Sequence, residues 1–276
     1  MHKKDVIYKF TGESPPFQPF ANGYTDSYQE CQLRWNPYCL KQDGLFYRFR
    51  TGDKEEEIEL IPDACLNVLI EFDESNPRAL FSGAFLRPVV LKLKPNTAYF
   101  GFKPYSNLGF KYRKIHPRDL VDSFTDFTYA FPCTERLVTE LFDVPVFEEQ
   151  ARIFLRYAAK YLADSDYSPT FVDYLALTLC SSSKSANFNN MSQVFGYSER
   201  YCREKFKDWH GLSPKQYNDI IRFQNTLKSL FSGSYKGLCA LAIEGGYFDQ
   251  SHLTREFKRY TNSPPDKYLK RYTITV

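Results

Sequence analysis

The sequence predicts an α+β fold, with a β-rich N-terminal domain followed by an all-α C-terminal domain. Three observations carry this prediction. Short segments rich in β-branched and aromatic residues fill residues 25–115, helical periodicity begins near residue 148, and the last hundred residues repeat themselves at an offset of about fifty. The expected division is a β-rich domain over residues 1–145, connecting helices and a linker over 146–184, and the repeat over 185–276.

The N-terminal region has six segments of strand character, separated by Pro, Gly, Asn or Asp: residues 45–50, 58–61, 65–72, 79–85, 89–94 and 98–102. This spacing predicts a mainly antiparallel sheet or a small barrel. The aromatic side chains of these segments either line a ligand cavity or form plain core, and both interpretations stay open: Phe46, Tyr47, Phe72, Phe81, Phe85, Tyr99, Phe100 and Phe102. Residues 148–163 and 169–180 predict helices, and residues 181–185 a linker.

Each copy of the repeat has the pattern of two short helices around a tight turn. Gly196 and Gly246 supply the turns, because glycine adopts a positive φ without strain. The second helix of each copy has an apolar stripe for burial, formed by Cys202, Phe206 and Trp209 in the first copy and by Leu253, Phe257 and Tyr260 in the second. Gly211 and Asn262 end these helices at matched positions.

The segment from Gly246 to Tyr260, followed by Ser-Pro-Pro-Asp-Lys-Tyr, resembles the signature of the AraC/XylS family of bacterial transcription regulators. The first copy is similar, although Ser192 stands where the family usually has Ala and Cys202 where it usually has Leu. The resemblance covers residues 185–272 and implies a DNA-binding domain with two helix-turn-helix motifs. It also implies a cupin-like sensor or dimerisation domain in the N-terminal region, and activation as the commoner role.

Between the two copies, the sequence predicts one helix that begins at Pro214 and ends before Gly233. About 17 helical residues span roughly 25 Å. A stiff spacer of this length is able to hold two recognition helices in adjacent major grooves, which lie about 34 Å apart.

Charge is divided unevenly along the chain. Residues 181–276 contain 15 lysines and arginines against 8 aspartates and glutamates, a net charge of +7, whereas residues 1–180 contain 21 against 25, a net charge of −4. A basic domain gains affinity for DNA because binding releases counterions from the phosphates. The basic half of the chain is also the half with the repeat.

The side chains expected to contact DNA project away from the buried stripes, near the start of each recognition helix, which Ser198 and Asp249 are expected to cap. The candidate base-reading residues are Arg200, Tyr201, Arg203 and Glu204 in the first copy and Gln250, Ser251, His252 and Arg255 in the second. Lys207, Lys258 and Arg259 are candidates for phosphate contacts. The ordinary alternatives are surface ion pairs for the arginines and a polar surface position for His252.

An enzymatic function is the alternative from another class. Cupin-type metal chemistry needs clustered histidines, whereas the four histidines of this chain are scattered: His2, His116, His210 and His252. A DNA-alkylation repair regulator would need paired zinc-binding cysteines, a spacing that Cys31, Cys39, Cys65 and Cys133 do not have. The sequence therefore predicts no catalytic residue, metal or cofactor. A partner-binding scaffold with a degenerate DNA-binding domain stays as a second alternative.

The expected partners are promoter DNA in double-stranded form and RNA polymerase, with a small-molecule effector and a second copy of the chain as further candidates. No apolar run has the length of a membrane span, and the first six residues lack the apolar stretch of a signal peptide. Seven cysteines at irregular spacing favour reduced thiols. These features predict a cytoplasmic protein without a membrane partner.

Overall fold

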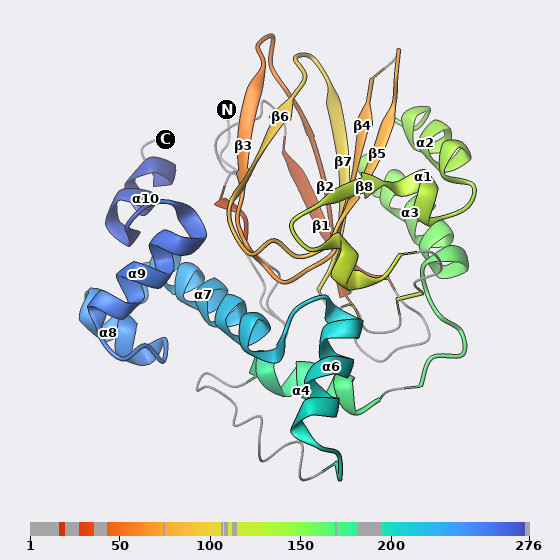
Figure 1. Cartoon of the computed structure of the whole chain (residues 1–276). Coiled ribbons are helices and arrows are strands. Elements are labelled where there is room, and N and C mark those ends of the chain that lie inside the picture. The colour runs from red at the N-terminus through yellow and green to blue at the C-terminus, as the bar shows by residue number, and fades with distance from the viewer. Residues whose placement is uncertain are drawn as a thin grey trace.

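The computed structural model describes residues 17–19, 28–35, 43–73, 75–105, 107, 110–111, 115–168, 170–181 and 195–273. It confirms the predicted α+β fold, with a sheet region in the N-terminal half and helices in the C-terminal half (Figure 1). Several residues named above lie outside the described part of the chain: His2, Cys39, the predicted linker after Ser181, and Ser192.

The described N-terminal strands form a six-stranded sheet in the order β1-β2-β7-β4-β5-β8 and a two-stranded sheet of β3 and β6. Every pairing in them is antiparallel. The strands are β1 Gln29–Arg34, β2 Asp43–Arg50, β3 Glu56–Leu60, β4 Asn67–Phe72, β5 Arg78–Ser82, β6 Val89–Leu93, β7 Ala98–Pro104 and β8 Phe124–Asp126. Of the two predicted arrangements, an antiparallel sheet or a small barrel, the structure has the antiparallel sheet. Strands β1 and β8 were not among the six predicted strands.

Two predicted strands are shorter than the sequence suggests. The segment 65–72 becomes a strand only at Asn67, because Ala64 has a φ of 60° and Asp63 Oδ1 accepts a hydrogen bond from the Cys65 N–H. The segment 79–85 ends as a strand at Ser82, because the Gly83 N–H donates to the Leu120 carbonyl instead of to a neighbouring strand. In both places local backbone bonding outweighs strand propensity.

The large sheet has apolar side chains on both faces. On one face Phe46, Phe100 and Phe102 pack against Phe154 of α3 (Phe147–Tyr161), with ring centroids 4.8–5.9 Å from that of Phe154. The other face, with Tyr47, Phe49 and Tyr99, packs against the small sheet of β3 and β6. The eight aromatic residues singled out in the sequence are all buried. They divide between these two cores, and Phe72 also lines a surface pocket.

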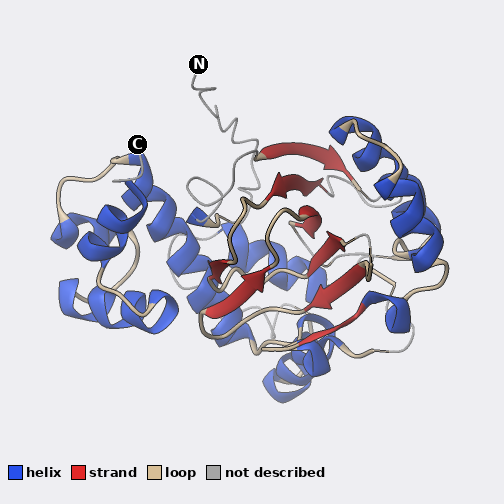
Figure 2. Cartoon of the chain, turned by 90° about the horizontal axis from the view of Figure 1, so that it is seen from above, coloured by secondary structure: helices blue, strands red, loops and turns tan. Residues whose placement is uncertain are grey.

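The remaining N-terminal helices are η2 (Pro117–Leu120), α1 (Phe127–Ala130), α2 (Thr134–Phe142) and α4 (Phe171–Ser181). The predicted helices over 148–163 and 169–180 correspond to α3 and α4. The prediction for residues 1–145 did not include α1 and α2, which lie at the side of the sheet (Figures 1 and 2).

The C-terminal helices are α6 (Glu199–His210), α7 (Pro214–Ser232), α8 (Leu238–Glu244), α9 (Gln250–Thr261) and α10 (Pro265–Thr273). The predicted spacer is α7, whose 19 residues span roughly 28 Å. Figure 1 shows α6 at one end of α7 and the group of α8, α9 and α10 at the other. A single helix therefore connects the two halves of the repeat.

The core of the C-terminal half also includes residues from the sheet region. Helices α4, α6, α7, α8, α9 and α10 contribute to one buried cluster, together with Ile61, Ala64 and Ala84. Gln224 of α7 is 3% exposed and donates through Nε2 to the Pro62 carbonyl at 2.7 Å, while its Oε1 accepts from the Phe17 N–H at 2.9 Å. The domain boundaries expected at residues 145 and 184 stay predictions.

Candidate nucleic-acid interface

The two recognition helices, α6 and α9, begin and end in the same way. Ser198 Oγ accepts a hydrogen bond from the Tyr201 N–H at 3.3 Å, and Asp249 Oδ1 accepts one from the His252 N–H at 2.7 Å. The helices end at Gly211 and Asn262, with φ angles of 76° and 55°. These caps satisfy backbone groups that a helix leaves unpaired at its ends. The repeat in the sequence is thus a repeat in local structure.

The buried stripe of each recognition helix fixes which side chains face outwards. Cys202 and Phe206 are buried on α6, with Trp209 half-buried beside them. Leu253, Phe257 and Tyr260 are buried on α9. Burial raises the pKa of the Cys202 thiol, which therefore stays neutral at physiological pH.

The predicted DNA-contacting residues of the first motif lie on the exposed face of α6. These residues are Arg200, Tyr201, Arg203, Glu204 and Lys207. Arg203 Nη2 lies 3.2 Å from Glu199 Oε2, so the ordinary alternative of a surface ion pair is realised in this structure. The Tyr201 ring is 42% exposed and packs beside Phe171 and Tyr197 in a surface aromatic group. The contacts with these two rings therefore help to orient the side chain of Tyr201 and its hydroxyl group.

The second motif gathers its predicted residues around one surface concavity. An open hollow of about 590 Å³ is lined by Gln250, Ser251, Thr254, Arg255 and Lys258. Thr254 is the member that the sequence interpretation missed; it lies one turn after Gln250 on the outward face, a spacing that would have identified it. Within the described residues, Arg255 and Lys258 form no ion pair. Both charges are therefore available to a polyanion.

Two further predicted residues of α9 have partners within the protein. His252 is half-buried, its Nδ1 accepts from the Phe248 N–H at 3.3 Å, and its ring lies 5.5 Å from that of Tyr247. The Arg259 guanidinium lies 5.4 Å from the centre of the Tyr260 ring. These contacts orient the two side chains on the surface of the motif.

Arg222 of α7 attaches the second motif to the spacer helix, a role that the sequence interpretation missed. Its Nη2 lies 3.0 Å from Asp219 Oδ1 and 2.8 Å from Glu256 Oε2 of α9. The guanidinium also covers the Tyr247 ring at 4.8 Å. With only 16% of its side chain exposed, Arg222 holds α9 in position against α7.

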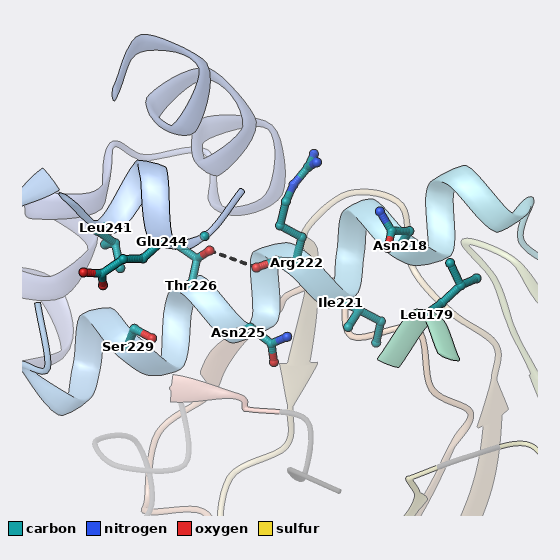
Figure 3. Close-up of a pocket in the computed structure, with 10 residues that line it drawn as sticks. Leu179, Asn218, Ile221, Arg222, Asn225, Thr226, Ser229, Leu241 and Glu244 are labelled. Atoms are coloured by element: carbon teal, nitrogen blue, oxygen red, sulfur yellow. Dashed lines mark hydrogen bonds between the residues drawn. The ribbon is translucent and has the colours of Figure 1, made fainter. Parts of the chain in front are cut away.

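A pocket of about 290 Å³ opens along α7 between the two halves of the C-terminal region (Figure 3). Leu179 of α4 lies beside Ile221 at one end, and Leu241 and Glu244 of α8 lie at the other. Within α7, Thr226 Oγ1 donates to the Arg222 carbonyl at 2.9 Å. The two halves thus meet mainly through the spacer helix itself.

The first motif also contacts the sheet region. The Arg118 Nη1 of η2 lies 3.3 Å from Asp208 Oδ1 of α6, and a Cβ on Gly211 would lie 2.6 Å from the Pro117 carbonyl oxygen. Beside this contact His210 is fully enclosed, with its ring against Phe206 and Tyr217. Burial lowers the pKa of His210 to about 3, so its ring is neutral at physiological pH.

Within the described ranges, no group of three or more His, Cys, Asp or Glu is placed to hold a metal ion. Five cysteines are thiols in this structure: Cys31, Cys65, Cys133, Cys202 and Cys239. No helix in this part of the chain is both long and apolar enough to cross a membrane.

Comparison with known proteins places the C-terminal half in a domain family. Residues 191–271 match a family model described as a helix-turn-helix domain. No curated protein sequence matches the chain.

Similar solved structures include ToxT from Vibrio cholerae, with 12% identity, a TM-score of 0.45, and coverage of 90% of this chain and 100% of that one. The C-terminal domain of AraT, a response regulator from Geobacillus stearothermophilus, has 18% identity and a TM-score of 0.35, over 37% of this chain and 86% of that one. A transcriptional regulator with an AraC-type DNA-binding domain from Chromobacterium violaceum has 16% identity and a TM-score of 0.32, over 37% and 88%.

The capped recognition helices, the matched turn glycines and the family model all concern the same segment. The signature from Gly246 to Tyr260 covers the turn after α8 and most of α9, as the resemblance implies. Residues 191–271 of this chain therefore form a helix-turn-helix domain, and they include the segment that resembles the AraC/XylS signature.

Proposed function

We propose that this protein is a sequence-specific transcription regulator, acting as an activator, in which α6 and α9 read adjacent major grooves of promoter DNA. The observation that carries the proposal is the outward face of α9, where Gln250, Ser251, Arg255 and Lys258 surround one concavity. Arg pairs with guanine and Gln with adenine through two hydrogen bonds each, so this face has the side chains that base reading needs.

The proposed division of labour follows position along each helix. Arg200, Tyr201, Arg203 and Glu204 on α6, and Gln250, Ser251, His252 and Arg255 on α9, lie near the helix starts and are proposed to contact bases. Lys207, Lys258 and Arg259 lie further along and are proposed to contact phosphates. The 19 residues of α7 span roughly 28 Å, which is comparable with the length of one turn of DNA, about 34 Å, and supports the proposal of adjacent grooves.

The N-terminal region is proposed to regulate this binding without catalysing a reaction. Its net negative charge keeps it away from phosphates, and its contacts with α6 and α7 give it a physical route to the DNA-binding half. A small-molecule effector and a second copy of the chain are the proposed regulatory partners, and RNA polymerase is the proposed partner of the activator at its promoters. The proposed place of action is the bacterial cytoplasm, where the chromosome is.

The test begins with a genome-wide map of bound sites for the full-length protein, followed by affinity measurements on a recovered promoter at several salt concentrations. Affinity is expected to fall steeply with salt. Arg255→Ala is expected to lose about 1–3 kcal/mol and to relax the preference at one base position, whereas Lys258→Ala weakens all sequences about equally.

Lys54→Ala, which removes one positive charge from an exposed turn of the sheet region, is the matched control and should leave affinity unchanged. If the folded protein shows no salt-sensitive binding to any recovered site, the scaffold alternative replaces the proposal. Equal, sequence-independent losses from Arg255→Ala and Lys258→Ala would instead assign Arg255 to the DNA backbone.

A further inference from the structure

An open pocket of about 580 Å³ lies at the end of the large sheet, beside the start of α3. On β2, Phe46, Arg48 and Arg50 alternate onto the face that α3 covers, and their exposure increases from the buried Phe46 to the exposed Arg50. Strand register places Arg50 opposite Ala98 of β7, and Ala98 opposite Phe72 of β4. Other lining residues come from the α2–α3 connection and from the turn between β6 and β7.

Two of the three cations that line the pocket, Arg48 and Arg50, have no carboxylate as an ion-pair partner among the described residues. Its third cation, Lys94, is occupied by Glu71, at 2.8 Å, and by Asp73. In the described part of the chain neither Arg48 nor Arg50 forms an ion pair. The pKa of Arg48 is lowered, first by burial and then by the neighbouring charge of Arg50. Two guanidinium groups that repel each other are stabilised when an anion binds between them.

Arg48 is already oriented for such an anion. Its Nη1 donates to the Pro145 carbonyl at 2.6 Å and to Gln150 Oε1 at 3.3 Å. Gln150 is itself buried and fixed, because its Nε2 donates to the Leu141 carbonyl at 2.7 Å. A guanidinium has five N–H donors, so Arg48 keeps donors for a ligand. Arg50 makes no hydrogen bond to another described residue through its side chain and is able to turn towards the same ligand.

We propose that this pocket binds a small organic phosphate monoester. A phosphate monoester carries nearly two negative charges at neutral pH and has three terminal oxygens, so it is able to pair with both guanidinium groups at once, whereas a monocarboxylate brings a single charge. Arginine also pairs with phosphate oxygens through two parallel hydrogen bonds. For the carbon body of the ligand, the pocket offers the rings of Phe72 and Phe142, whose centres lie 6.0 Å apart, and the side chain of Pro95.

A phosphate bound here acts on the structure through Arg48. That residue joins β2 to the α2–α3 connection, so a ligand that draws on its guanidinium changes how firmly the connection is held against the sheet. As an effector site the pocket rests on the proposed regulatory function. As a binding site it does not, because binding is measured in the absence of DNA.

The experiment is isothermal titration calorimetry on the full-length chain at fixed ionic strength, with phenyl phosphate, inorganic phosphate and benzoate as separate probes. Phenyl phosphate is expected to bind saturably and more tightly than either of the other two. Arg50→Gln should weaken its binding about tenfold or more, since a charge-assisted hydrogen bond is lost. Arg87→Gln removes one exposed arginine from the β5–β6 connection and should have no effect.

Arg50 is exposed, so its substitution leaves the core unchanged, and circular dichroism checks that the variant is folded. Arg48→Gln, which also removes the bonds to Pro145 and Gln150, should weaken phenyl phosphate binding at least as much. Benzoate binding as tightly as phenyl phosphate, an undiminished affinity of Arg50→Gln, or no saturable binding of any probe would each overturn the proposal. Promoter binding measured in parallel shows separately whether the proposed function holds.

Discussion

The two helix-turn-helix motifs have the same local plan but are held by different parts of the molecule. Helix α6 of the first motif packs on η2 of the sheet region and makes the Arg118–Asp208 ion pair. Helix α9 of the second motif packs mainly on α7, α8 and α10, and Arg222 ties it to α7. The difference shows that the first recognition helix itself makes an ion pair with the sheet region, whereas the second motif reaches that region through α7 and through the Arg271–Glu59 pair of α10. Both motifs are thus linked to the sheet region, the first through its recognition helix and the second through the helices beside it.

The largest expected effect is at Gly211, where α6 ends against Pro117. An alanine there combines a left-handed φ of 76° with a Cβ only 2.6 Å from a backbone oxygen, so Gly211→Ala should cost about 3 kcal/mol of unfolding free energy. Gly233→Ala, at a φ of 67° with open space around it, isolates the backbone strain and should cost about 1 kcal/mol. Urea denaturation measures both. Equal losses would mean that the contact with Pro117 is loose.

The next effect is a pH dependence confined to the first motif. His210 has a pKa lowered to about 3 by burial, against about 6.5 in the unfolded chain, so the unfolded state binds the proton first as the pH falls. Its contribution to stability is complete above about pH 6.5 and declines as the pH falls towards 3, by about 2–3 kcal/mol at pH 4.5. The matched residue of the second motif is Thr261, which does not titrate.

The measurement is the difference in unfolding free energy between pH 7 and pH 4.5 for the native chain and for His210→Phe. The variant should lose less stability on acidification than the native chain. His116→Gln, which changes an exposed histidine, is the control and should behave like the native chain. An equal loss in the native chain and His210→Phe would mean that the buried ring is already protonated or hydrated.

A smaller effect is expected at Arg222, which holds the second motif. Arg222→Ala leaves Asp219 and Glu256 without their cation, and the pKa of Asp219 is already raised by burial, so the loss should be about 2 kcal/mol. Arg136→Ala breaks an exposed i,i+4 pair with Glu140 and should change stability by no more than about 0.5 kcal/mol. Thermal and urea unfolding of both variants decide the comparison. A loss at Arg222 no larger than at Arg136 would show that α9 is held by its apolar stripe alone.

The smallest effect is expected at Arg118, which makes the exposed ion pair of the first motif. Its side chain is 51% exposed and that of Asp208 is 44% exposed, so solvent screens the pair and Arg118→Ala should cost about 0.5 kcal/mol or less. A double-mutant cycle with Asp208→Asn measures the coupling directly. A coupling well above 1 kcal/mol would show that this pair, rather than the contact at Gly211, attaches the first motif to the sheet region.

The features that the sequence predicted well have short-range causes. The turn at Gly246, the end of α9 at Asn262 and the start of α7 at Pro214 each depend on the backbone preferences of one or two residues. The apolar stripes of α6 and α9 depend only on helical spacing. Such signals are complete within one turn or one helix, so they can be recognised without knowledge of the tertiary structure.

The features that the sequence did not predict depend on distant partners or lack a local signal. Helix α2 begins after Cys133, which has a φ of 60° and makes no capping bond, so the usual start signal is missing. Strand β1 has few apolar residues and is held by its backbone pairing with β2. The Arg222–Glu256 pair joins residues 34 apart in the chain, and the pocket at Arg48 and Arg50 is lined by residues from three strands and two connections.

The bond from Gln224 to the Pro62 carbonyl has a consequence for biosynthesis, because the two residues are 162 positions apart. At roughly 5–20 residues per second, the ribosome delivers Gln224 about 8–30 s after Pro62. During that interval Ile61, Ala64 and Ala84 have no C-terminal helices to cover them, although all three end in the core that those helices form. The nascent sheet region therefore exposes a small apolar surface until α7 has been synthesised. A chaperone, or a second nascent chain on the same messenger RNA, would first bind at this surface.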